Sequence, residues 1–296
     1  YLPSVGFVVL VALAIERTYQ IKVLRQTANY VIISILVILI GLYSIGTIKR
    51  NYIWKDAYSL WTDTTKKSPD SSMAHYNLGL VYFEQQKLED AIKEYMIALR
   101  LKPNYTDAHN NLGTAYCAQG RFDDAINEFM IAIKLKPNYP DAHYNLGTAY
   151  AMQGKFDDET MNEFMIAIKL KPDSPEAHNN LGLVYFEQQK FNDAMKEFMI
   201  AIKLKPNLAE ANNNLGRVYF ELQRFDDAIK EYITALKLKP GYVEAHYNIG
   251  NAYAMQGKFD EALKEYTIAT RLKPDHIGAH YNLGLVYLEK GLKHKA

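Results

Sequence analysis

Seven asparagines recur at a spacing of 34 or 35 residues, and they form the row of side chains best suited to bind a polypeptide. They are Asn77, Asn111, Asn145, Asn180, Asn214, Asn248 and Asn282. Asparagine is a mediocre helix former, so helix formation alone does not demand it. Its amide offers both a donor and an acceptor, so the row could hold an extended backbone by paired hydrogen bonds. The alternative is that each amide bonds to a neighbouring unit or to solvent.

An acidic residue stands four positions before each interior asparagine. Four residues is about one helical turn, so the acid and the amide share one helical face. This second row predicts a mild preference of the same face for basic peptides. Its members are Asp107, Asp141, Glu176, Glu210 and Glu244.

A row of histidines stands two residues before the asparagines, at 75, 109, 143, 178, 246 and 280, with Asn212 interrupting it. Packed helices lie about 8–10 Å apart, whereas zinc needs ligand nitrogens at about 2 Å. Histidines of adjacent units therefore cannot share one ion, and we interpret the row as packing. No paired carboxylates, nucleophile or glycine-rich phosphate loop stands out, so no catalytic residue, metal or cofactor is predicted.

The three rows belong to one repeated unit of about 34 residues. Complete units span 72–105, 106–139, 140–174, 175–208, 209–242 and 243–276, and a partial one spans 277–296. Each has Ala at its position 3, Gly at 8 and Tyr at 11. Small residues let two helices pack closely, and a proline near the end of each complete unit stops its second helix. A fixed period of this length predicts an all-α solenoid.

The recurring Ala, Gly and Tyr resemble the tetratricopeptide repeat (TPR). This resemblance implies two helices per unit and a superhelix that turns the first helices inward. The asparagine row is similar to that in the TPR superhelix of O-GlcNAc transferase, where such asparagines hold extended polypeptide. The resemblance therefore implies a peptide or protein partner in a concave groove.

The net charge and the cysteine count of the chain exclude some classes of function. The net charge is +1, which does not suggest nucleic acid. Cys117 is the one cysteine, so an intrachain disulfide framework is excluded. It takes a position where sibling units carry Ala151 and Ala254, and we interpret it as a small packed residue.

Residues 1–48 are predicted to be a membrane segment. Residues 30–48 contain no charge over 19 positions, close to the ~20 needed to cross a bilayer as a helix. Residues 2–15 are apolar but shorter. We predict a transmembrane helical pair in contact with lipid, and a buried soluble hairpin is the alternative.

Residues 49–71 join this segment to the array. Ala57 and Trp61 stand one period before Ala91 and Tyr95, which predicts a degenerate half-repeat helix over 53–67. That helix would cover the first apolar face of the solenoid. In the third repeat, Glu159-Thr160 adds one residue, which must be absorbed at the start of the second helix or as a π-bulge.

The front end carries a second resemblance. The run 1–7 (YLPSVGF), a basic loop, an apolar span and Trp54 and Trp61 are similar to the C-terminal part of multi-spanning glycosyltransferases with TPR tails, such as the transmembrane TPR O-mannosyltransferases. In that family the catalytic acids lie in an early loop that this chain lacks, so no catalytic residue is carried over. The chain begins with Tyr1 and ends within a repeat, which we interpret as a fragment.

These patterns predict a membrane-anchored TPR scaffold, the tail of a membrane glycosyltransferase. The alternative is a non-enzymatic assembly scaffold whose repeats stack, by self-association, or bind a partner complex. The Lys and Arg count around residues 30–48 leans slightly toward a cytoplasmic array. The resemblance implies the periplasmic or luminal side, and we follow it because a long following domain weakens the charge rule.

Overall fold

The computed structural model describes residues 11–13, 16 and 25–291, and this part of the chain is helical throughout, without a strand. It begins with α2 (Arg25–Ile53) and α3 (Ala57–Lys67). The first helices of the seven repeats are α4 (Ser72–Glu84), α6 (Thr106–Ala118), α8 (Pro140–Met152), α10 (Pro175–Glu187), α12 (Ala209–Glu221), α14 (Val243–Met255) and α16 (Ile277–Glu289). The second helices are α5 (Leu88–Leu101), α7 (Phe122–Leu135), α9 (Asp158–Leu170), α11 (Phe191–Leu204), α13 (Phe225–Leu238) and α15 (Phe259–Leu272). The all-α prediction is therefore confirmed, and each first helix begins at the first residue of its predicted unit.

The two helices of a repeat cross where a glycine meets an aromatic ring. A Cβ atom placed on Gly182 would lie 2.6 Å from the Phe198 ring, and one on Gly79 would lie 2.6 Å from the Tyr95 ring. These rings are almost fully buried. The close approach explains the sequence rule, because no side chain larger than hydrogen fits between helix and ring.

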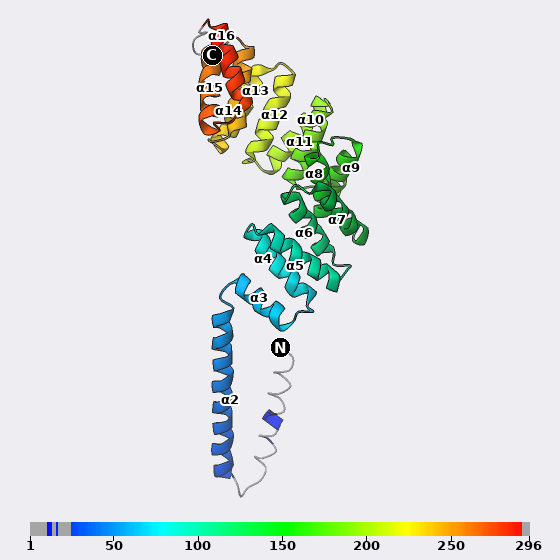
Figure 1. Ribbon diagram of the computed structural model, residues 1–296, viewed down its shortest axis with the longest axis vertical. Coiled ribbons are helices and arrows are strands. Elements are labelled where there is room, and N and C mark those ends of the chain that lie inside the picture. Colours follow the sequence, from blue (N-terminus) through cyan, green and yellow to red (C-terminus); the bar gives the residue numbers. More distant parts are fainter. Residues whose placement is uncertain (1–10, 14–15, 17–24, 292–296) are drawn as a thin grey trace.

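Stacking of the repeats produces an elongated array with an inner and an outer side (Figure 1). The first helices of neighbouring repeats contact one another, whereas no such contact joins successive second helices in the part of the chain that the structure describes. The first helices are therefore closer together and line the inner, concave side. The second helices spread apart on the convex side.

The junction forms a helix that packs on the first repeat. Helix α3 contacts α4, and the rings of Tyr58 and Tyr82 meet edge to face with centroids 5.8 Å apart. Asp56 caps the helix by accepting from the backbone N–H of Ser59 at 2.7 Å. Apolar surface at the start of the array is thereby covered.

The extra residue in the third repeat is absorbed before its second helix. Helix α9 begins later in the repeat than its siblings, after an N-cap in which Asp157 accepts from the N–H of Thr160. Thr160 takes the place of the usual alanine and is fully buried. Its hydroxyl donates to the carbonyl of Lys155 at 3.1 Å, so the added polar group is satisfied. The first of the two predicted ways of accommodating the insertion is the one that occurs.

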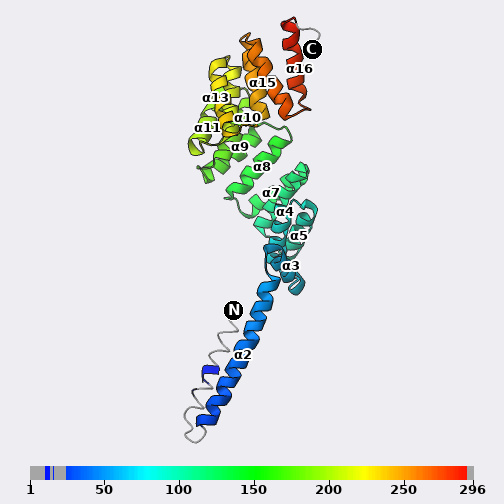
Figure 2. The same cartoon turned by 90° about the vertical axis from the view of Figure 1, so that its left-hand side faces the viewer.

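Helix α2 extends away from the array in both views (Figures 1 and 2). Its segment Tyr30–Ile48 has 19 residues, a mean hydropathy of 2.6 and no buried side chain. It is long and apolar enough to cross a membrane. The predicted partner helix over residues 2–15 lies almost wholly outside the described residues.

Candidate functional site

All seven asparagines lie on first helices, and none of them is fully exposed. Except in the first repeat, each Nδ2 reaches back to the preceding repeat. It donates to the residue that stands 35 or 36 positions earlier. The acceptors are the hydroxyls of Tyr76, Tyr144 and Tyr247 at 3.0–3.3 Å and the Oδ1 atoms of Asn110, Asn179 and Asn213 at 3.0–3.1 Å. The donor half of the ladder therefore ties first helix to first helix along the concave side.

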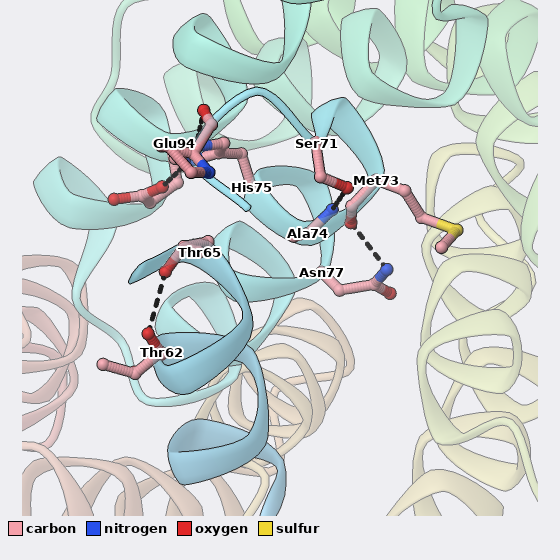
Figure 3. A network of polar contacts seen from close by, with 9 residues as sticks. Thr62, Thr65, Ser71, Met73, Ala74, His75, Asn77 and Glu94 are labelled. Carbon is pink, nitrogen blue, oxygen red and sulfur yellow. Dashed lines mark hydrogen bonds and ion pairs between the residues drawn. The ribbon is translucent and has the colours of Figure 1, made fainter. Parts of the chain in front are cut away.

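Asn77 differs because no first helix precedes it. Its Nδ2 donates instead to the carbonyl of Met73 in its own helix at 2.7 Å (Figure 3). This difference supports the interpretation that the other amides serve the stacking of repeats. It matches the alternative that we left open from the sequence, in which the amide bonds to a neighbouring unit.

The acceptor half of the ladder is used unevenly. Oδ1 of Asn111 and of Asn180 each accepts a 3.3 Å hydrogen bond from the asparagine one residue earlier. Among the described residues, none donates to Oδ1 of the other five asparagines, which are Asn77, Asn145, Asn214, Asn248 and Asn282. Five amide oxygens of the ladder are thus left without a donor, and that of Asn214 belongs to a residue only 7% exposed.

The sequence reasoning missed the residue that completes the ladder. Every asparagine is preceded by Tyr or Asn, and both types can accept the hydrogen bond from the next repeat. This restriction to Tyr or Asn was visible in the sequence: the residues are Tyr76, Asn110, Tyr144, Asn179, Asn213, Tyr247 and Tyr281. It would have indicated an inter-repeat role for the amide nitrogen.

The acidic row is solvent-accessible and partly paired. Asp107 accepts from the Tyr139 hydroxyl at 3.0 Å, and Lys205 Nζ lies 2.9 Å from Glu176. The hydrogen bond from Lys205 holds the pKa of Glu176 below its ordinary value. Lys239 makes the equivalent pair with Glu210 at 3.3 Å. These partners screen part of the negative charge, and Asp141 and Glu244 keep theirs exposed.

The groove-facing stripe of the first helices is strongly acidic. Positions 2, 6, 9 and 13 of each repeat fall on one helical face. Across the seven repeats this stripe carries nine acidic residues and one basic residue, Arg217. The acids are Glu84, Asp107, Asp141, Glu176, Glu187, Glu210, Glu221, Glu244 and Glu289. The near-neutral total charge therefore conceals a local excess of negative charge along the groove.

The histidine row is held inside the repeats. His75, His109, His143 and His178 are at most 8% exposed, so the predicted packing role is confirmed for them. Their Nδ1 atoms lie 2.5–2.6 Å from a glutamate of the second helix, as Figure 3 shows for His75 and Glu94. Cys117 is half-buried, and burial raises the pKa of its thiol to about 11. That thiol remains protonated and suits packing rather than reactivity.

Paired helices stacked at this period define a helical-repeat scaffold. The family model described as TPR repeat matches residues 79–120, 113–154, 161–189, 182–223, 216–257 and 250–291. The chain therefore belongs to the TPR repeat family. TPR scaffolds generally bind peptide or protein partners.

Two curated relatives are protein O-mannosyl-transferases. One from Caenorhabditis elegans is 32% identical over 101 residues, which are 34% of this chain and 14% of the relative. Tmtc2 of Drosophila melanogaster is 30% identical over 102 residues, which are 34% of this chain and 10% of the relative. The chain thus spans only a small part of the length of these relatives.

Solved structures agree on the fold. The Cut9–Hcn1 hetero-tetramer of the APC/C matches with a TM-score of 0.69 at 21% identity, over 78% of this chain and 45% of that one. YrrB, described as a TPR protein with an unusual peptide-binding site, matches with a TM-score of 0.50 at 21% identity, over 63% and 96%. At these identities the likeness concerns the fold alone.

Proposed function

We propose that the array binds an extended, basic polypeptide along its concave groove. The observation that carries this proposal is the groove-facing stripe, with nine acidic residues against one basic residue. Charges of one sign gathered in a groove attract and orient a ligand of the opposite sign. Asn145 and Asn248 are partly exposed and add amide oxygens that no described residue uses, and these accept from backbone N–H groups of the ligand.

The carboxylates and amides have separate roles in this proposal. The carboxylates of Asp141 and Glu244 bind lysine or arginine side chains, because they have exposed charge and no ion-pair partner within the described residues. The amides contact the ligand backbone and carry no side-chain preference. Binding is therefore selective for charge and extended conformation.

The experiment removes charge without changing shape. The full chain in lipid nanodiscs is titrated against a fluorescein-labelled lysine-rich peptide, followed by fluorescence anisotropy. Asp141→Asn, Glu221→Gln and Glu244→Gln are combined in one variant. Exposed interactions of this kind are worth about 0.2–1 kcal/mol each, so we expect roughly a 3- to 150-fold loss of affinity and a weaker dependence on salt.

The matched control removes three charges from the convex side. Glu89→Gln, Asp158→Asn and Glu261→Gln lie at exposed positions on second helices and change the net charge equally. This variant is expected to bind as the unmodified chain does. Equal losses in both variants would mean that net charge alone acts, and no binding by the unmodified chain would overturn the proposal.

We further propose that α2 anchors the array in a membrane and that the chain is the tail of a membrane glycosyltransferase. The support is the exposed apolar segment Tyr30–Ile48 and the likeness to part of protein O-mannosyl-transferases. In this proposal the array lies on the non-cytoplasmic side, and a cytoplasmic array is the alternative. Protease treatment of sealed vesicles of known orientation distinguishes the two, because only an outward array is digested.

A further inference from the structure

Two hollows open along the groove near its C-terminal end, and they share Phe220 and Asn251 as lining residues. The first lies between α10, α12 and α14 and has a volume of about 120 Å³. The second lies between α12, α14 and α16 and has a volume of about 300 Å³. The two hollows lie at equivalent positions of the array, one repeat apart. Their difference in volume must therefore come from differences between the side chains that line them.

Two side chains differ between the registers: position 9 carries Arg217 in the smaller hollow and Asn251 in the larger, and position 12 carries Phe220 and Ala254. At position 12, three repeats carry Phe83, Phe186 and Phe220, whereas the third and sixth repeats carry Ala151 and Ala254. The smaller hollow has Phe220 and Phe186 in its wall, and the Arg217 guanidinium lies 4.3 Å from the centroid of the Phe186 ring. The larger hollow has Ala254 in its wall. One phenyl ring is missing from the lining there.

The lining of the larger hollow is apolar where a guest would touch it. Its inner wall includes Val286 (4% exposed) and Tyr266 (1% exposed), and Met255 and Leu285 stand at the rim. Oδ1 of Asn251 already accepts from the Tyr266 hydroxyl and from Nδ2 of Asn282, both at 2.8 Å. These polar atoms are paired with each other, which leaves carbon surface for the guest.

We propose that this hollow, named here the Ala254 hollow, binds one aromatic side chain of the peptide in the groove. The proposal rests on the proposed groove function and adds a side-chain preference to it. A volume near 300 Å³ is at the lower end of ligand sites, which suits a single side chain and not a cofactor. Glu221 and Glu244 stand on the same groove-facing stripe, so the ligand carries a lysine or arginine beside the aromatic residue.

The test compares two labelled peptides on the full chain in lipid nanodiscs. Both are lysine-rich ten-residue peptides, one with a central phenylalanine and the other with alanine in its place. Burial of an aromatic side chain predicts a gain of roughly 10- to 100-fold in affinity for the phenylalanine peptide. Fluorescence anisotropy at fixed salt measures both affinities.

The Ala254→Phe variant fills the hollow with the residue that three sibling repeats already carry there. Its helicity and unfolding temperature should match those of the unmodified chain. We expect it to bind the alanine peptide unchanged and to lose the phenylalanine gain. Ala151→Phe is the matched control. Ala151 stands at the equivalent position of the third repeat, but the repeat before it carries Cys117 where the repeat before Ala254 carries Phe220.

The outcomes separate the two proposals. Equal binding of both peptides to the unmodified chain overturns the Ala254 hollow and leaves the groove function in place. A phenylalanine gain that persists in Ala254→Phe, or that Ala151→Phe removes equally, also overturns the hollow. Binding of neither peptide overturns the groove function, and the hollow with it. A gain that only Ala254→Phe removes supports the proposal.

Discussion

Nδ1 of His109 lies 2.6 Å from Oε2 of Glu128, and Nε2 of the same ring lies 2.9 Å from the carbonyl of Pro103. The carbonyl can only accept, so Nε2 carries a proton. Nδ1 then meets the carboxylate favourably only when a second proton lies between them. The unit links the second helix of a repeat, its first helix and the turn before it. The same arrangement recurs at His75, His143, His178 and His246.

The stability of the array should fall as pH rises above neutrality. Burial by itself lowers the pKa of His109, but the hydrogen bonds to Glu128 and Pro103 outweigh it, so that pKa stands above 6.5. A raised histidine pKa contributes stability that is complete below about 6.5 and is lost as pH passes the raised value. We therefore expect the unfolding temperature of the chain, followed by circular dichroism in nanodiscs, to drop between pH 6 and pH 9.

The control for this pH dependence replaces His109 by asparagine, the residue that the fifth repeat carries at this position as Asn212. In His109→Asn, the part of the decline that comes from the His109–Glu128 pair should vanish. The variant should also be less stable at pH 6. An unfolding temperature that rises over this pH range in the unmodified chain would contradict the proposed role of the shared proton.

Asn212→His should stabilise the array. The fifth repeat keeps Glu231, whose pKa is raised by burial, but has Asn212 where its siblings have histidine. A histidine there would reach Glu231 and the carbonyl of Pro206, as its siblings do. Hydrogen bonds to charged groups contribute about 1.5–3 kcal/mol, and the lost bond from Asn212 to the Leu208 carbonyl offsets part of this. We expect a rise of several degrees at pH 6.5, and a fall of similar size for His178→Asn.

The histidine row shows how far sequence reasoning reaches. The spacing excluded a shared metal and predicted packing, because helix separations are known in advance. The glutamate partner was not predicted, although a glutamate follows each of these histidines by 19 or 20 residues. Contacts between two helices of one repeat depend on rotamers and crossing angle, which a repeat pattern does not contain.

The asparagine ladder was only partly predictable for a related reason. Its place on the first helices followed from the 34-residue period. Whether Asn145 faces a ligand or its neighbour depends on how closely adjacent repeats approach, and only the structure shows its Nδ2 3.0 Å from Asn110. The Ala254 hollow also depends on three repeats together, so no single repeat indicates it.

Replacing glutamine by glycine in the turn within a repeat should stabilise the chain. Gln86, Gln189 and Gln223 adopt positive φ values of 59–60°, whereas Gly120 and Gly154 stand at the equivalent position of other repeats. This left-handed conformation costs a residue with a side chain about 1 kcal/mol more than glycine. The triple glycine variant should unfold at a temperature several degrees higher, as measured by calorimetry. No change would mean that the glutamine side chains compensate for the strain.

A glycine-to-alanine pair tests the packing rule at the helix crossing. A Cβ on Gly182 would lie 2.6 Å from the Phe198 ring, whereas one on Gly284 would meet nothing within 4 Å. Both residues hold position 8 of a first helix, so their helix propensities are matched. Overpacking costs about 1–3 kcal/mol, and alanine favours a helix by up to about 1 kcal/mol over glycine. Gly182→Ala should therefore lower the urea midpoint of unfolding, while Gly284→Ala should leave it unchanged or raise it slightly. If both variants shifted the midpoint equally, the close approach of helix and ring would not be what requires glycine there.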